Sequence, residues 1–227
     1  MDDPKVDFVS FFDYFTNIVE RTVVDEKLTR DKVDGIVHAA QRRFASFGYS
    51  KVTMDEIAED VGMAKASLYY YFPTKEAIFR SVVQYEQQEF LTQANGVLQQ
   101  KSAADLKLLE YVRLRLKLTQ RLNNLSHFHQ QGWHEIKPIF NDLFATFVEH
   151  EIRCVLHILQ EGKKTGEFQL EHPQKTASMI LHVLQGLRMR FLRGEDQQAG
   201  NEPDRLLFEQ ETLHFTSTVL HGICKCK

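Results

Sequence analysis

Histidines are the residues of this sequence whose spacing first suggests metal chemistry. His127, His129 and His134 form an H-x-H-x4-H cluster, and His150 and His157 lie seven residues apart in the following helical segment. Zinc sites commonly use three or four such ligands, but zinc-binding helices place histidines at i and i+4 or add a carboxylate at a fixed offset. No HExxH motif is present. We therefore interpret these histidines as pocket-lining or surface residues and predict no metal site.

The cysteines and the search for catalytic motifs point the same way. Cys224 and Cys226 form a C-x-C that could bind a soft metal or sense redox state, although an inert tail is the simpler interpretation. The odd total of three cysteines indicates a reducing compartment without a disulfide framework. The sequence contains no Gly-rich phosphate loop, nucleophile elbow or paired-carboxylate signature. It therefore predicts neither an enzyme nor a cofactor.

Side chains that could bind a nucleic acid gather between Lys51 and Lys75, where the sequence reads KVTMDEIAEDVGMAKASLYYYFPTK. Thr53 and Glu56 form a capping box that starts one short helix, and Gly62 stands where a left-handed residue usually ends a helix. A second short helix follows the turn, and Pro73 cannot continue it. Two short helices joined in this way are the helix-turn-helix plan, whose second helix enters the DNA major groove.

This segment and its flanks resemble the N-terminal DNA-binding domain of TetR-type (tetracycline-repressor-like) transcriptional regulators. The family pattern is a Gly after a Phe-bearing helix, then T-x-x-x-I-A-x-x-x-G, L-Y-x-[HY]-F and x-x-K-E-x-[LI]. The matching positions are Gly48, Thr53, Ile57, Ala58, Gly62, Leu68, Tyr69, Tyr71, Phe72, Lys75, Glu76 and Ile78. The resemblance covers residues 30–80 and extends more weakly over the rest of the chain.

The resemblance implies that the second short helix and the start of the first one read the DNA sequence. Thr53 and the first free amides of its helix can hold a phosphate, and Lys65 can hydrogen-bond a base edge or a phosphate. Ala66 is small enough to approach a thymine methyl group, and Lys75 matches the family's phosphate-binding lysine. The residues implied to bind DNA are Thr53, Ala64, Lys65, Ala66, Ser67, Tyr69, Tyr70 and Lys75.

Apolar periodicity predicts helices along nearly the whole chain, in an all-α protein of three parts. Residues 1–29 carry a phenylalanine stripe opposite an acidic face and predict an amphipathic helix. This helix would pack on the protein itself or dock another protein, and its acidic face disfavours a membrane. Residues 30–80 form the three-helix DNA-binding domain, and residues 81–227 form a larger helical domain for effector binding and dimerisation. No Pro- or Gly-rich linker separates the last two parts.

The predicted helices within these parts have the following limits. They span 30–47 with Phe47 facing inward, 74–98, 103–125, a long segment from Phe140 to near Gly162, 177–192 and 203–221. Gly132 and Pro138 are expected to break the chain into an irregular segment over residues 126–138.

The C-terminal part also resembles TetR regulators, through Glu161-Gly162, Gly166-Glu167-Phe168 and Pro173. The resemblance implies an effector pocket between the middle helices, and an aromatic, mostly apolar cavity would suit a small lipophilic ligand. A filled core is the alternative for each candidate. The pocket candidates are Tyr111, Arg115, Phe128, His129, Trp133, Phe140 and Phe144. The last two helices would form a dimer through Ile180, Leu184, Leu187, Phe191, Leu213 and Leu220.

The charge distribution also bears on DNA binding. The chain has a net charge of −3, while residues 30–80 hold eight basic and seven acidic side chains. DNA affinity depends on where cations meet phosphates rather than on the total charge. Such a weakly charged reading domain indicates that affinity depends on dimerisation. The acidic N-terminus is unlike a secretory signal, and no apolar run is long enough for a membrane span, so a cytoplasmic protein is expected.

The sequence thus predicts a homodimeric transcriptional regulator that binds a palindromic operator and is released by a small ligand. Repression is the common outcome in the resembled family, and activation remains open. Two alternatives belong to other classes. One is a small-molecule enzyme on a helical body. The other is a protein-interaction adaptor that docks through the N-terminal phenylalanine stripe and has degenerate DNA binding.

Overall fold

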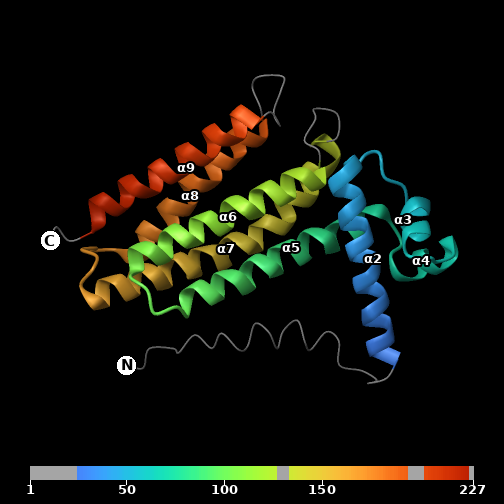
Figure 1. Ribbon diagram of the computed structural model, residues 1–227, viewed down its shortest axis with the longest axis horizontal. Helices are drawn as coiled ribbons and strands as arrows, with labels where there is room; N and C mark the ends of the chain where they lie inside the picture. The colour runs from blue at the N-terminus through green and yellow to red at the C-terminus, as the bar shows by residue number, and fades with distance from the viewer. Residues whose placement is uncertain (1–24, 127–132, 194–201, 225–227) are drawn as a thin grey trace.

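The computed structural model describes residues 25–126, 133–193 and 202–224, and nearly all of them are helical (Figure 1). The elements are α2 (Asp25–Phe47), α3 (Met54–Asp60), α4 (Lys65–Tyr71), α5 (Lys75–Leu98), α6 (Ala104–Ser126), α7 (Trp133–Thr165), α8 (Pro173–Arg193) and α9 (Glu202–Ile223). Within these ranges, β structure is limited to an isolated antiparallel bridge between Phe168 and Cys224. The prediction of an all-α fold is confirmed.

Helices α2, α3 and α4 form a small head at one end of the molecule, beside the start of α5 (Figure 1). Ile36 and Phe44 of α2, Ile57 of α3 and Leu68 of α4 are fully buried in a shared core. The ring of Phe79 in α5 joins them, with its centroid 5.3 Å from that of Phe44. Helices as short as α3 and α4 are marginal alone. Burial of these side chains, at roughly 1.5–3 kcal/mol each, therefore holds them in place.

The larger body consists of α5, α6 and α7 lying along one another, with the paired helices α8 and α9 beside them (Figure 1). Leu108, Tyr111, Val155, Ile158 and Leu159 are fully buried in its core. Helix α5 belongs to both head and body, so the domain boundary predicted at residue 80 falls inside a continuous helix. None of the helices in the described ranges combines the length and the apolar character needed to cross a membrane.

Gly162 allows a close contact between α7 and the chain that follows it. A Cβ atom built there would lie 2.3 Å from Cδ2 of Phe168 and 2.9 Å from the Cβ of Ala104. The predicted helix end near Gly162 is wrong, because α7 continues to Thr165 and the left-handed residue is Gly166, with φ of 80°. Gly162 therefore makes room for an aromatic ring rather than a turn.

Three further predictions about helices differ from the structure. Helix α2 begins at Asp25 rather than at residue 30. Phe47 was expected to face inward but is 56% exposed, because the helix ends there and Tyr49 fills the core position instead. Pro138 does not break the chain, because it lies in the second turn of α7, where it removes a single hydrogen bond near the helix start. The predicted helix within residues 1–29 lies mostly outside the described residues.

The head is joined to the body by a buried carboxylate. Glu86 of α5 is 3% exposed, and it accepts a 2.5 Å hydrogen bond from Nε2 of Gln41 in α2. Nη1 of Arg121 in α6 lies 3.3 Å from its other oxygen. Glu86 thus connects three helices beside a cleft of about 440 Å³, which is lined by Gln41, Arg42, Ala45, Tyr85, Glu86, Glu89 and Arg121.

Candidate nucleic-acid interface

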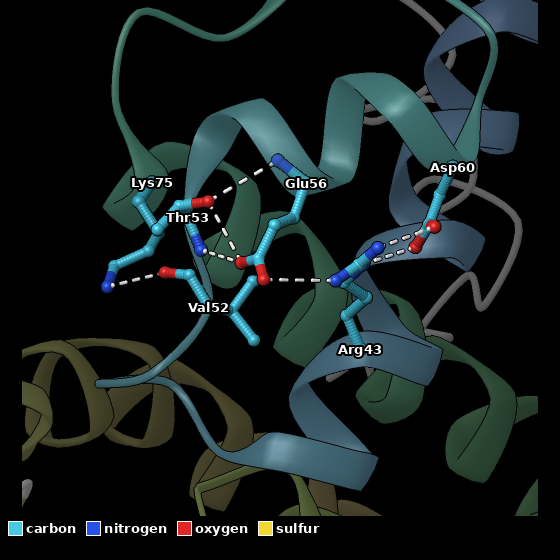
Figure 2. Close-up of polar contacts among 6 residues, drawn as sticks. All are labelled: Arg43, Val52, Thr53, Glu56, Asp60 and Lys75. Carbon is cyan, nitrogen blue, oxygen red and sulfur yellow. Dashed lines mark hydrogen bonds and ion pairs between the residues drawn. The ribbon is translucent and has the colours of Figure 1, made fainter.

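Helix α3 begins with the predicted capping box (Figure 2). The amide of Glu56 donates to Oγ1 of Thr53 at 3.3 Å, and the amide of Thr53 donates to Oε2 of Glu56 at 2.8 Å. The hydrogen bond from the Thr53 amide is the main reason why the pKa of Glu56 is lowered. The Thr53 hydroxyl also donates to this carboxylate, at 2.9 Å. Donors that were expected to hold a DNA phosphate therefore already bind a carboxylate of the chain.

Arg43 fixes α3 against α2 through its guanidinium group (Figure 2). Its Nε and Nη2 atoms donate to the two oxygens of Asp60, at 2.5 and 2.8 Å, and Nη1 lies 3.2 Å from Glu56. The hydrogen bonds from Arg43 are the main cause of the lowered pKa of Asp60. A two-point arginine–carboxylate contact of this kind defines orientation as well as distance.

The turn between α3 and α4 depends on Gly62. This residue has φ of 65°, a left-handed conformation that only glycine adopts without strain. The following amide, of Met63, donates to the carbonyl of Ala58 at 2.9 Å and closes the end of α3. Beyond the turn, Leu68 and Phe72 are buried against the head core at 0% and 7% exposure. One face of α4 is therefore anchored, and the opposite face points to solvent.

The exposed face of α4 carries nearly all of the residues predicted to bind DNA. Tyr70 is 84% exposed, an unusually high value for an aromatic side chain, and Tyr69 is 41% exposed. Ala64, Ala66 and Ser67 are also exposed. The structure thus gathers on one short helix and its N-cap residue Ala64 a hydroxyl donor, two phenols and two small residues that permit close approach.

Lys65 also lies on this face, beside an acidic residue of α3. Its Nζ atom is 2.8 and 2.9 Å from the carboxylate oxygens of Asp55. The hydrogen bond to Asp55 is the main reason why the pKa of Lys65 is raised. Both side chains are more than half exposed, so a DNA phosphate or base can compete for the ammonium group.

Lys75, at the start of α5, is only half exposed to solvent and takes part in the head's own structure (Figure 2). Its ammonium group donates to the carbonyls of Tyr49 and Val52 at 2.9 and 3.0 Å, and it lies 4.4 Å from the centroid of the Tyr49 ring. Lys75 therefore ties the loop before α3 to α5. Its predicted contact with phosphate stays a prediction.

Comparison with known proteins identifies this arrangement. A family model described as "Bacterial regulatory proteins, tetR family" matches residues 36–82. The crystal structure of a transcriptional regulator from Cytophaga hutchinsonii is 36% identical and has a TM-score of 0.79, and the match covers 86% of this chain and 99% of that one. The chain belongs to the TetR family. It is therefore a DNA-binding regulator by family rather than an enzyme.

Two further TetR-family relatives share less sequence identity with this chain. A TetR transcription regulator from Haloarcula marismortui shares the fold, with a TM-score of 0.66 at 18% identity over 86% of this chain and 100% of that one. The nucleoid occlusion factor SlmA of Pectobacterium carotovorum is 28% identical over 179 residues, which are 75% of this chain and 87% of the relative.

The predicted effector residues of this TetR-family chain fall into two groups. Tyr111, Arg115 and Phe144 are all buried in the body. Phe128 and His129 lie outside the described residues, as do the side chains of Trp133 and Phe140. In the part of the chain that is described, no group of three His, Cys, Asp or Glu side chains could hold a metal ion. His127 and the side chain of His134 are not in that part.

The residues predicted to form the dimer interface lie on the less exposed side of the helix pair α8 and α9. Ile180, Leu184 and Leu220 are at most 7% exposed within a single chain, so they have little surface left to bury against a second copy. Leu187 and Leu213 are half-buried, and the side chain of Phe191 is not described. The exposed apolar side chains of α8 and α9 are instead Met179 at 67%, Val183 at 40%, Leu206 at 47% and Leu207 at 48%.

Three functional candidates were missed by the sequence analysis. Glu86, Glu151 and Arg188 are charged but buried. The signal in the sequence that could have revealed them is a charged residue at a position where helical periodicity predicts an apolar one. Arg188, for example, follows the buried residues Leu181 and Leu184 at i+7 and i+4 along α8.

Proposed function

We propose that this TetR-family protein binds a near-palindromic DNA operator as a homodimer and is released by a small molecule that binds in the body. The observation that carries the proposal is the exposed face of α4, where Lys65, Ser67, Tyr69 and Tyr70 stand out from a helix anchored by Leu68. Large aromatic side chains that are exposed next to one another form a patch of the kind that marks an interaction surface. Their gathering on the second helix of a helix-turn-helix therefore supports a role in DNA contact.

The contacts divide by chemistry. Lys65, with Ser67, reads base edges in the major groove, while Ala66 permits close approach to a thymine methyl group. Tyr69 and Tyr70 bind the sugar-phosphate backbone through their rings and hydroxyls. Lys75, at the start of α5, binds a flanking phosphate. Thr53 supports the site by starting α3 and makes no separate phosphate contact, because its hydroxyl and amide donate to Glu56.

Dimerisation brings two such heads to one duplex, with their recognition helices roughly 34–36 Å apart. The interface is formed by α8 and α9, through Met179, Val183, Leu206 and Leu207, because these apolar side chains are exposed in the single chain. Gly186 lies on the same stripe of α8 and has open space around it, which allows a second backbone to approach.

Residues 30–80 act as the DNA-binding domain and residues 81–227 as the effector and dimerisation domain. The shared helix α5 carries the signal between them, because it packs in the head at Phe79 and in the body at Phe90. A ligand that favours a different tilt of α5 changes the distance between the two heads. DNA is released only to the extent that the ligand prefers the altered state.

Selection of bound duplexes from a random library tests this proposal. We expect an inverted repeat whose half-sites are one helical turn apart, and gel shifts on it whose affinity falls steeply with salt. The double variant M179E/V183E should be monomeric by analytical ultracentrifugation and should bind the repeat much more weakly. Selection of no sequence at all, or of a single unrepeated half-site, would contradict the proposal.

A second candidate is suggested by the relative from Pectobacterium carotovorum named nucleoid occlusion factor SlmA, which matches over 87% of its length. In that case the protein would bind many sites across the chromosome, and its DNA-bound form would act on something other than a promoter. Chromatin immunoprecipitation separates the two. A few sites upstream of genes favour the regulator, and many sites spread over the chromosome favour the occlusion factor.

A further inference from the structure

Three buried charges lie together where α6, α7 and α8 meet in the body. Nε of Arg115 donates to Oε1 of Glu151 at 2.6 Å, and the hydroxyl of Tyr111 donates to the same oxygen at 3.2 Å. Arg188 of α8 stacks on the ring of Phe144, with its Cζ atom 4.0 Å from the ring centroid. The cluster therefore contains two guanidinium groups and one carboxylate.

Arg188 is the member of this cluster without an anionic partner among the described residues. It is 7% exposed, and its Nε atom is buried without a hydrogen bond. Burial and the nearby charge of Arg115 lower its pKa to about 10, against an opposing effect of the Glu151 carboxylate, which is already paired with Arg115. One carboxylate shared by two buried guanidinium groups leaves a net positive charge, and a buried cation is normally paired.

The surroundings of the cluster are largely aromatic. The ring of Phe147 lies 5.7 Å from that of Phe144 and 5.6 Å from that of Phe90, between centroids. The ring of Phe90 lies 5.6 Å from that of Tyr111. A molecule bound next to Arg188 among these aromatic rings would therefore contact apolar ring faces and edges and one cation.

We propose that the effector is a small carboxylate with an apolar body, whose carboxylate group is bound by Arg188. The inference rests on the proposed ligand-released function and names the chemical class of the ligand. One negative charge would balance the second guanidinium group, and the planar fork of arginine suits the two oxygens of a carboxylate. The apolar body would lie against Phe144 and Phe147. A cationic ligand would instead add to the existing excess of positive charge.

The experiment uses the full-length protein with two soluble carboxylates, octanoate below its micelle-forming concentration and 4-phenylbutyrate. Octanamide and 4-phenylbutanamide serve as neutral analogues of the same shape. We expect a saturating carboxylate to raise Tm by at least about 3 °C, since a ligand that binds only the folded state stabilises it. The amides should leave Tm nearly unchanged. Isothermal titration calorimetry gives the affinities.

Two arginine variants separate recognition from packing. Arg188→Met keeps an unbranched apolar side chain but removes the buried charge, so without ligand its Tm should equal or exceed that of wild type, while its affinity for the carboxylate falls at least about tenfold. Arg113→Met changes an exposed arginine of α6 and should retain wild-type affinity. A purely structural Arg188 would give the reverse pattern, with a lower Tm in Arg188→Met and unchanged ligand response.

The inference is overturned if neither carboxylate binds, if the amides stabilise the protein equally, or if Arg188→Met keeps the wild-type affinity. Operator binding is measured separately, so the two proposals can fail independently. Carboxylates that bind through Arg188 but leave operator affinity unchanged support the ligand class and contradict ligand release. Release of DNA by another compound, with no dependence on Arg188, supports the regulator and contradicts the ligand class.

Discussion

Replacement of Lys75 by methionine tests how the head is held together. The ammonium group of Lys75 donates to the carbonyls of Tyr49 and Val52 and lies over the Tyr49 ring. Methionine keeps much of the length and apolar surface of the side chain but removes the donors and the charge. Both carbonyls belong to buried residues, at 8% and 1% exposure, so they depend on the protein for hydrogen bonds.

The size of the effect follows from these contacts. A hydrogen bond from a charged donor contributes about 1.5–3 kcal/mol. Lys75 is only half-buried, however, and water can replace part of what is lost. We therefore expect Lys75→Met to lower the free energy of unfolding by about 2 kcal/mol for the two bonds together. For a chain of this length, that corresponds to a fall in Tm of about 4–8 °C.

Thermal unfolding followed by circular dichroism measures this fall, and Lys51→Met serves as a control because Lys51 is an exposed lysine in the same loop. A Tm within about 1 °C of wild type would refute the structural role assigned to Lys75. Operator binding as a function of salt, measured well below the Tm, tests the phosphate contact separately. If Lys75 also neutralises a phosphate in each half-site, the slope of log K against log salt becomes shallower by about two units for the dimer, one for each protomer.

Three further predictions concern other parts of the chain. Gly162→Ala should destabilise the protein by about 1–3 kcal/mol, because an aromatic ring occupies the space for its Cβ. Gly96→Ala, in open space on α5, should instead stabilise it by about 0.5–1 kcal/mol. Urea denaturation measures both free energies of unfolding, and equal effects would contradict the packing argument. Asp55→Asn should raise operator affinity and steepen its salt dependence, because it removes a negative charge and releases Lys65; lower affinity in gel shifts would show that the acidic side chain helps to bind DNA. Because the pKa of Asp60 is depressed in the folded state, its stabilising contribution is complete above its ordinary pKa of 3.8 and disappears as the pH falls through the depressed value. The Tm difference between wild type and Asp60→Asn should therefore be constant above about pH 5 and shrink below pH 3.8. A constant Tm difference down to pH 2 would exclude this linkage.

Local signals made the head of the molecule predictable. The capping box at Thr53 and the left-handed Gly62 are set by residues close together in sequence, so both could be recognised without a structure. The periodic burial of Leu68 and Phe72 then determined which face of α4 remained exposed. Even so, the side chain of Lys75 was understood only in part, because its backbone acceptors lie more than twenty residues earlier in the chain.

The sequence was an incomplete guide where long-range packing decides which side chains are buried. The apolar face of α8 is wide enough to offer two stripes, and the sequence could not show that Ile180 and Leu184 pack within the chain while Met179 and Val183 remain exposed. Pro138 was expected to lie in an irregular segment because its position in the second turn of a helix could not be seen from the sequence. Arg188 was overlooked because its unmet charge becomes visible only when the helices around it are assembled.

The contact between Glu86, Gln41 and Arg121 limits how such regulators can be recombined. A common way to build new sensors is to graft the DNA-reading part of one protein onto the ligand-binding part of another. A cut near residue 80 would keep Glu86 and Arg121 but bring in whatever residue the donor has in place of Gln41. A hydrophobic residue there would leave the buried carboxylate with Arg121, at 3.3 Å, as its remaining side-chain partner among the described residues. A hybrid that keeps this body should therefore also keep glutamine at position 41, although that position lies within the DNA-reading part taken from the other protein.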